Sequence, residues 1–170
     1  YKEQEVNVDL DLAHLKKLNA PIKLKIEKDG NQYLVTGSYY VPVDAFSFQK
    51  EPVKIEKTLA SLPASINTRV GTLSFTKNGN FKLKDGESLK AIIVSPEMAA
   101  SGYAKALAVS QTSKTTTIAE LVLKDEDPQR SIDYLNTLIK VYNRQANEDK
   151  NEISYRTEQF INQRLEKINS

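Results

Sequence analysis

The chain has 170 residues, about the length of one domain, and a chain of this size buries a hydrophobic core without help from disulfides or metals. Its 24 Lys and Arg against 22 Asp and Glu give a net charge of +2, which excludes the basic surface typical of nucleic-acid binding. It contains no cysteine, which excludes thiol catalysis, disulfides, zinc–thiolate sites and iron–sulfur clusters.

The composition predicts a folded, water-soluble unit. Apolar residues make up 39% and charged residues 27%, and the mean hydropathy is −0.49. The longest strictly aliphatic run, residues 91–94, is far too short to cross a bilayer. Because the chain begins at Tyr1, without Met or a secretion signal, we expect it to be a segment of a longer protein.

Alternating side chains predict an antiparallel hairpin near the start of the chain. Residues 22–26 alternate between Ile or Leu and charged side chains, and the turn-forming pair Asp29-Gly30 follows. A second β-rich run covers residues 32–40 and completes this hairpin. Another strand is expected over residues 53–57.

A second hairpin is predicted around Asn78-Gly79, the pair best suited to a tight primed turn. Apolar residues alternate towards this pair over residues 73–75 and away from it over 81–83. Asp85-Gly86 then turns the chain into a further strand over residues 89–94. The lysines of the 81–84 segment lie on the other side, so this sheet is expected to have one solvated face.

A short helix and two more strands are expected next. Pro96 suits the first turn of a helix that extends through Ala106. Residues 106–111 and 115–123 are rich in aliphatic and β-branched side chains, which favour strands.

The clearest helix start is at Asp127-Pro128. An Asp at the N-cap accepts the unpaired amide hydrogens, and Pro fills the first helical position, where no donor is needed. No glycine follows Gly102 and no proline follows Pro128. This composition shift predicts a single domain, 1–170, of the α+β class, with a β-hairpin-rich base over 1–127 and a long helical arm over 128–170.

The predicted helix carries an apolar stripe that is interrupted in the middle. Apolar residues recur at three- and four-residue spacing at Ile132, Leu135, Leu138, Ile139 and Tyr142, and again at Ile153, Phe160, Ile161, Leu165 and Ile168. Residues 143–152 are polar except for Ala146, so the helix either continues through water or bends there. Unbroken, it would extend about 60 Å, beyond the about 40 Å of a compact chain, and its stripe would need a partner.

Catalytic constellations are scarce. His14 is the one histidine and no G-x-S-x-G motif occurs, so we expect His14 to be structural or to face solvent. Asp9 and Asp11 would share one side of a strand, the minimum for acid–base work or a hard cation, but such pairs are common on surfaces. The cluster 125–127 lacks the spacing of a calcium loop, and helix capping explains it.

Two further candidate sites are weak. Ser113-Lys114-Thr115 contains the Lys-Thr pair of a phosphate loop, but no glycine lies within ten residues before Lys114, which excludes a nucleotide site. Tyr33, Tyr39 and Tyr40 are close enough in sequence to form a stacking patch for sugars, although such residues more often fill cores.

Opposite charges alternate along the predicted helix. This pattern predicts intrahelical pairs or subunit contacts among Arg144, Lys150, Arg156 and Arg164 with Glu148, Glu152, Glu158 and Glu166. A solvated helix face is the simpler explanation, so no site is assigned there. The sequence therefore predicts no catalytic residue, no metal ligand and no cofactor.

The order and spacing of residues over 115–168 resemble a known family. The residues that carry the resemblance are Ile118-Ala119-Glu120-Leu121, Asp127-Pro128, Leu135-Asn136, Tyr142, Phe160-Ile161 and Leu165. In these, the region resembles the periplasmic part of bacterial polysaccharide co-polymerases, the chain-length determinant family that includes the membrane tyrosine autokinases of capsule and exopolysaccharide export. About a third of the chain matches well, and the β-rich region before it only loosely.

The resemblance implies a non-enzymatic role. The chain would be a periplasmic segment of an inner-membrane protein, held between two transmembrane helices outside residues 1–170, and it would regulate polysaccharide chain length through assembly. Implied partners are further copies in the full-length protein, a polysaccharide polymerase, an outer-membrane exporter and a glycan. No Walker motif or tyrosine-rich tail is present, so any kinase domain would lie elsewhere. The elaborate hairpins favour the autokinase branch.

Two other classes remain open. The first is a β-sandwich module that binds glycan or protein, with its C-terminal helix packed across the sheet, and burial of Ile153, Phe160 and Leu165 would favour it. An extended helix that exposes these side chains would favour the co-polymerase. A hydrolase or transferase is the weakest class, because no acid–base or nucleophile constellation supports it.

Overall fold

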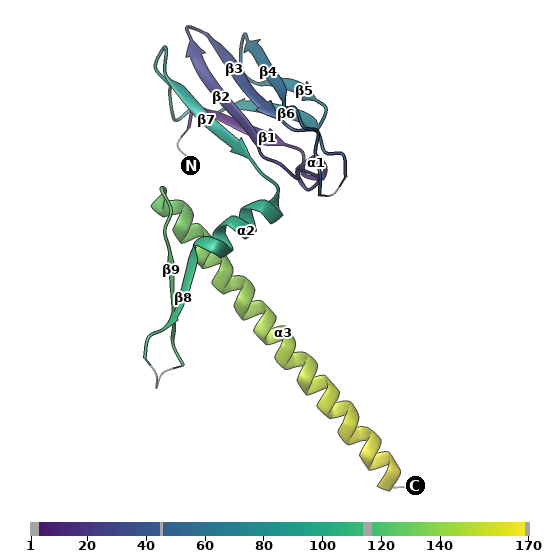
Figure 1. Ribbon diagram of the computed structural model, residues 1–170. Coiled ribbons are helices and arrows are strands. Elements are labelled where there is room, and N and C mark those ends of the chain that lie inside the picture. The colour runs from purple at the N-terminus through teal and green to yellow at the C-terminus, as the bar shows by residue number, and fades with distance from the viewer. Residues whose placement is uncertain (1–3, 45, 114–116, 169–170) are drawn as a thin grey trace. The chain divides into compact units, whose positions relative to one another are not determined.

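The computed structural model describes residues 4–44, 46–113 and 117–168 (Figure 1). The chain forms two compact units, Tyr1–Ala106 and Leu107–Ser170, which are described separately. The predicted α+β class is confirmed, with antiparallel sheets, a short helix and a long C-terminal helix. The division between the units falls at Ala106, whereas the composition shift at Pro128 marks the start of the long helix.

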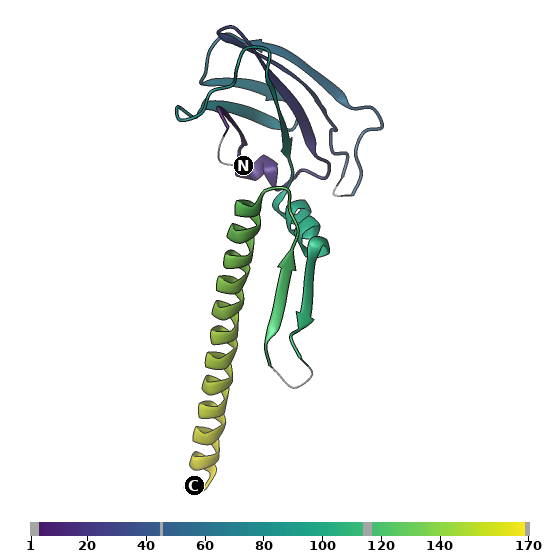
Figure 2. The ribbon, with the colours of Figure 1, turned by 90° about the vertical axis from the view of Figure 1, so that its left-hand side faces the viewer.

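The first unit contains two antiparallel sheets that face each other (Figures 1 and 2). The three-stranded sheet has the order β1 (Val6–Leu10), β6 (Gly71–Lys77), β5 (Ala64–Thr68). The four-stranded sheet has the order β4 (Val53–Leu59), β3 (Gln32–Tyr39), β2 (Ile22–Asp29), β7 (Ser88–Ile93). The unit also contains two helices, α1 (Leu12–Leu15) and α2 (Pro96–Ala106).

The core lies between these two sheets because apolar residues alternate along their strands. Ile22, Leu24 and Ile26 of β2 are buried, as are Leu73 and Phe75 of β6, while the side chains that alternate with them, Lys23, Lys25 and Ser74, are exposed. Burying such side chains stabilises the fold by about 1.5–3 kcal/mol each. The unit is therefore a β-sandwich. The predicted hairpins alone do not indicate that the strands form two complete sheets.

The first predicted hairpin is confirmed and the second is wrong. β2 and β3 pair from Lys23↔Ser38 to Asp29↔Gln32, with Gly30 in the left-handed region at φ 58°. Residues 81–84 form no strand, because both edges of β6 are already occupied by β1 and β5. The expected strand over 89–94 is β7, and it pairs with β2.

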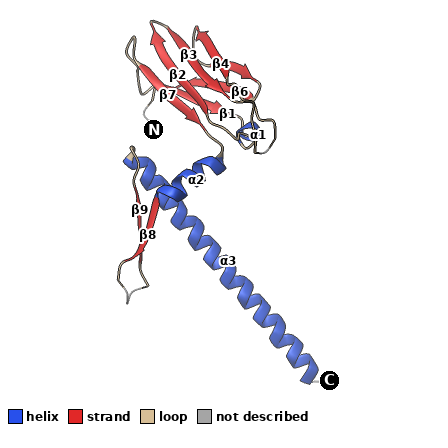
Figure 3. Cartoon of the chain, viewed as in Figure 1, coloured by secondary structure: helices blue, strands red, loops and turns tan. Residues whose placement is uncertain are grey.

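The described residues of the second unit form a hairpin and a helix. β8 (Leu107–Gln111) pairs with β9 (Ala119–Leu123), which confirms both predicted strands with a shorter second one. α3 (Pro128–Ile168) is a single helix of 41 residues, and Figure 3 shows it without interruption. The polar stretch 143–152 therefore continues the helix. None of the helices in the described ranges combines the length and apolarity needed to cross a bilayer.

Both predicted helix starts are capped, the one at Asp127 as expected and the one before Pro96 by a residue for which no cap was predicted. Asp127 accepts a hydrogen bond from the amide of Arg130 at 3.1 Å, which places Asp127 at the N-cap and Pro128 at the first helical position. In α2, the hydroxyl of Ser95 accepts from the amide of Met98 at 3.3 Å. These local contacts explain why the two helices begin where the sequence places them.

Candidate functional site

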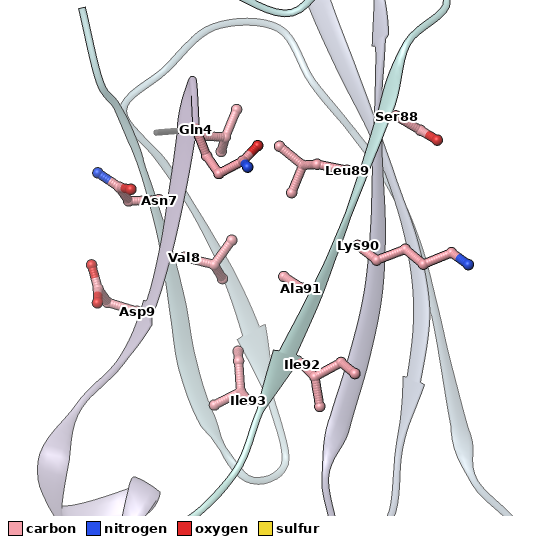
Figure 4. A pocket seen from close by; sticks show the side chains of 11 residues that line it. Gln4, Asn7, Val8, Asp9, Ser88, Leu89, Lys90, Ala91, Ile92 and Ile93 are labelled. Carbon is pink, nitrogen blue, oxygen red and sulfur yellow. The ribbon is translucent and has the colours of Figure 1, made fainter. Parts of the chain in front are cut away.

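A groove of about 720 Å³ lies between β1 and β7, the free edges of the two sheets (Figure 4). Its inner wall comes from alternate residues of the two strands. Figure 4 shows the side chains of Val8, Leu89, Ala91 and Ile93 pointing into the gap, and these four are only half-buried. The sandwich is thus incompletely sealed along this seam.

The outer rim of the groove is polar. Asn7 and Asp9 of β1 and Ser88 and Lys90 of β7 point away from the gap in Figure 4 and are exposed. Ile92 is an exception, because its apolar side chain is 65% exposed on this rim. The groove therefore has an apolar inner wall and a largely polar rim.

The buried carboxylate of Glu5 lies just before β1, and the sequence patterns do not predict it. Its oxygens accept hydrogen bonds from the Leu83 amide, from the Tyr33 hydroxyl at 2.9 Å and from the Lys28 ammonium at 3.3 Å. The ammonium of Lys77 lies 3.5 Å away. Burial alone would raise the pKa of Glu5, but these hydrogen bonds outweigh it and hold the pKa below its ordinary value.

Tyr33 responds to the same contact in the opposite sense. Burial, and then the neighbouring Glu5 carboxylate, raise the pKa of Tyr33 to about 12, because both disfavour the phenolate. The carboxylate oxygens of Glu5 and the hydroxyl of Tyr33 are buried and already paired with each other and with Lys28, Lys77 and the Leu83 amide. It therefore fixes β1 to the second sheet rather than offering a reactive group.

The predicted pair Asp9 and Asp11 is not brought together on one strand. Asp9 belongs to β1, whereas Asp11 is the N-cap of α1 and accepts from the amide of His14 at 3.1 Å. The His14 ring bonds the same carboxylate at 2.7 Å, which lowers the pKa of Asp11. The expectation that His14 is structural or faces solvent is confirmed, since it is exposed and supports this cap.

The three tyrosines do not form a stacking patch. Tyr33 and Tyr39 are buried in the core, and the Tyr39 hydroxyl accepts from the amide of Arg69 at 3.2 Å. Tyr40 is half-buried and packs against Phe48, with ring centroids 4.7 Å apart. The favoured expectation, that such residues fill the core, is confirmed for Tyr33 and Tyr39, and the weaker alternative of a sugar-stacking patch is excluded because the sandwich covers these two rings.

The acidic cluster before α3 has a structural use. Asp125 binds the guanidinium of Arg130, with one nitrogen–oxygen distance of 2.8 Å, and this contact holds the pKa of Asp125 well below its ordinary value. The amide of Asp127 donates to Asp125 at 3.1 Å. Asp127 caps α3, as the sequence predicts, whereas Asp125 is held by an ion pair with Arg130 that the sequence patterns do not predict. Of the rejected phosphate-loop triplet, Lys114 and Thr115 lie outside the described residues.

Within the second unit, α3 presents an apolar stripe that the hairpin of the same unit does not cover. None of residues 128–168 is buried, and every residue from 147 to 168 is exposed. Apolar side chains recur every seventh residue at Ile132, Ile139, Ala146, Ile153 and Phe160, which we call the heptad stripe. Ile153 is 65% and Phe160 56% exposed. Of the predicted charge pairs, Arg144–Glu148 and Arg156–Glu152 form, both on the surface.

Comparison of the chain with protein-family models, with curated proteins and with solved structures finds no match. Within residues 4–44, 46–113 and 117–168, no three His, Asp or Glu side chains gather as metal ligands would. The groove between β1 and β7 and the heptad stripe of α3 are therefore the candidate interaction surfaces.

Proposed function

We propose that residues 1–170 are a non-catalytic periplasmic segment of an inner-membrane polysaccharide co-polymerase. In this proposal the segment regulates the chain length and export of capsular or exopolysaccharide through oligomeric assembly. The observation that carries the proposal is the uninterrupted 41-residue helix with its uncovered heptad stripe. The family resemblance of residues 115–168 supplies the identity of the process.

The heptad stripe supports helix-to-helix assembly. A seven-residue repeat is the spacing at which one helix packs against another, because the seam then stays aligned along a supercoil. Most helical stability in proteins comes from such packing, and an isolated helix gains little from propensity alone. A stripe of Ile and Phe on a helix of about 60 Å is therefore best explained by a partner helix.

The polar features of α3 fit the same role. Two i,i+4 ion pairs, Arg144–Glu148 and Arg156–Glu152, stabilise the helix by a few tenths of a kcal/mol each. The Arg164 guanidinium lies 5.2 Å from the centre of the Phe160 ring, which shields one face of that ring. These contacts keep the helix formed while its stripe stays available.

The test is performed in the full-length parent protein in its host. We expect Ile153→Glu and Phe160→Glu to change the length distribution of the exported polysaccharide on a gel, because a charge at either position disrupts stripe packing. Gln159→Glu is the matched control, since Gln159 is exposed on the same turn but outside the stripe. An unchanged length distribution for both stripe variants, at normal protein levels, would refute the proposal.

A second candidate, a β-sandwich binding module, is favoured by the sandwich fold of the first unit. Within the second unit, Leu165 is 51% exposed, as Ile153 and Phe160 are exposed, so these side chains are not covered by the hairpin of their own unit. The two candidates separate in the experiment above, because a binding module tolerates both stripe substitutions.

A further inference from the structure

The seam between β1 and β7 leaves backbone groups open on both sides. β1 is the terminal strand of one sheet and β7 the terminal strand of the other, and among the described residues each pairs only with its inner neighbour. An edge strand with unpaired N–H and C=O groups is a template for another strand. A strand inserted between β1 and β7 would have to form backbone hydrogen bonds with both edges at once.

The hydrogen-bond phase of β1 follows from one contact. The carbonyl of Glu5 accepts from the amide of Asn78 at 2.7 Å, so the backbone of Glu5 faces β6. Because this orientation alternates along an antiparallel strand, Asn7 and Asp9 also face β6. The open groups of β1 therefore belong to Val6, Val8 and Leu10, whose side chains point inward.

In β7 the open backbone groups belong to the outward residues, which is the opposite of β1. The amide of Lys28 donates to the carbonyl of Glu87 at 3.0 Å, so the backbone of Glu87 faces β2. By the same alternation, Leu89, Ala91 and Ile93 face β2, in keeping with their register against β2. The open groups of β7 belong to Ser88, Lys90 and Ile92, whose side chains point outward.

These two phases suit a single inserted strand. In an antiparallel pair, residues directly opposite each other have side chains on the same face. The inward residues of an inserted strand can then bond Val6, Val8 and Leu10. The backbone groups of its outward residues point towards the opposite edge and can bond Ser88, Lys90 and Ile92. If β7 had its open groups on its inward residues, one strand could not serve both edges.

The chain directions of β1 and β7 also suit a single strand inserted between them. In Figure 4 the labels from Gln4 to Asp9 and from Leu89 to Ile93 descend together, so β1 and β7 run the same way. Direct pairing would be parallel in an otherwise antiparallel sandwich, whereas a strand between them is antiparallel to both. We propose that the groove binds an extended peptide strand of a partner protein.

The walls of the groove define the chemistry of that strand. Small apolar residues at its inward positions complete the core against Val8, Leu89, Ala91 and Ile93. On the rim, Lys25 forms an ion pair with Glu27 at 2.6 Å, but Lys90, directly opposite Lys25, has no carboxylate partner among the described residues. An acidic residue at the outward position beside Lys90 supplies that partner.

Binding requires a modest opening of the seam. Some Cα atoms of β1 and β7 approach within 8 Å, whereas two strands that flank a third are about 9.6 Å apart. The seam therefore separates by a small distance where the strands converge. The cost is offset by hydrogen bonds on both edges and by burial of the four half-exposed apolar side chains.

The test uses the full chain and a fluorescein-labelled heptapeptide. The peptide has Val at its four odd positions, Thr at the second and sixth, and Glu at the fourth. Lys90→Pro removes an amide that does not bond β2, so the fold tolerates it, as edge strands tolerate proline. We expect Lys90→Pro to weaken peptide binding, followed by fluorescence anisotropy, at least tenfold.

Lys90→Ala is the matched control because it keeps the backbone amide, and we expect it to weaken binding less than about threefold. A second arm does not depend on folding of the variant: methylation of the peptide backbone at Glu should abolish binding to the unaltered chain. Equal binding of both peptides, or of the unaltered chain and Lys90→Pro, would overturn the proposal. Self-association that Lys90→Pro abolishes would also overturn it, since a second copy would then occupy the groove.

Discussion

The Tyr33 hydroxyl donates a hydrogen bond of 2.9 Å to a carboxylate oxygen of Glu5, and both side chains are buried. Glu5 immediately precedes β1 of one sheet, whereas Tyr33 belongs to β3 of the other. The contact is therefore a polar link across an otherwise apolar sandwich. Lys28 and the Leu83 amide complete it, so the start of the edge strand β1 is held by groups from several segments.

Removal of the Glu5 carboxylate should destabilise the first unit severely. We expect Glu5→Ala to lower the free energy of unfolding by about 3 kcal/mol, because it leaves Lys28, Tyr33 and the Leu83 amide without their shared acceptor. Urea denaturation of the full chain measures this change. Glu27→Ala, which removes a surface ion pair with Lys25, is the control and should cost less than about 0.5 kcal/mol.

The same carboxylate should make stability depend on pH in the acidic range. The pKa of Glu5 is lowered on folding, so its contribution is fully present above its ordinary value of 4.5 and is lost as the pH falls through the folded pKa. Comparison of the unaltered chain with Glu5→Gln isolates this contribution from that of other carboxylates. We expect the stability difference between the two proteins to shrink on acidification, and a constant difference would contradict the assignment.

Tyr33 should make the folding stability depend on pH in the alkaline range, where stability is lost as the pH rises. Its pKa is raised on folding from 10.0 to about 12, so its contribution is complete below pH 10 and is lost as the pH rises towards 12. Ultraviolet titration of the folded chain should show a tyrosine ionisation step near pH 12, and this step should disappear in Tyr33→Phe.

Gly37 in β3 should not tolerate a side chain. A Cβ at this position would lie 2.1 Å from the carbonyl oxygen of Lys23 on the neighbouring strand. We expect Gly37→Ala to cost more than about 2 kcal/mol, measured by thermal unfolding, because strand backbone must move. Gly102→Ala is the control: nothing lies within 4 Å of its Cβ position, and Ala in α2 should be neutral or stabilise it by about 1 kcal/mol.

The chain 1–170 by itself should associate weakly or not at all. A stable helical seam needs apolar residues at two positions of each heptad, but three residues after Ala146, Ile153 and Phe160 come Asp149, Arg156 and Gln163. The remaining contact area would come from the parent protein. Sedimentation velocity at micromolar concentration should show a monomer, and a stable high-order ring would contradict this expectation.

Local signals account for the parts of the fold that the sequence predicted correctly. Asp29-Gly30 closes its hairpin, and Asp127-Pro128 caps α3, because the groups that satisfy each other lie within a few residues. Asn78-Gly79 was misleading for the opposite reason. Its turn has the right local chemistry, but β6 pairs with β1 and β5, and the Leu83 amide bonds Glu5 instead of a strand partner.

The candidate site depended on relationships that no local pattern contains. The three partners of Glu5 lie 23, 28 and 78 residues away, so its burial could not be predicted from its neighbours. The alternation of Val6, Val8 and Leu10 with polar residues was a usable signal for β1. Only the complete strand order shows that β1 and β7 are edge strands. It also shows that the open backbone groups of β1 belong to inward residues and those of β7 to outward residues.

The absence of proline and glycine after Pro128 has a mechanical consequence. A continuous helix of 41 residues behaves as a stiff lever of about 60 Å, with no hinge along its length. A tilt of about 10° at its capped end displaces the opposite end by about 10 Å. Small adjustments near Asp127 are thus amplified into large movements at Ile168.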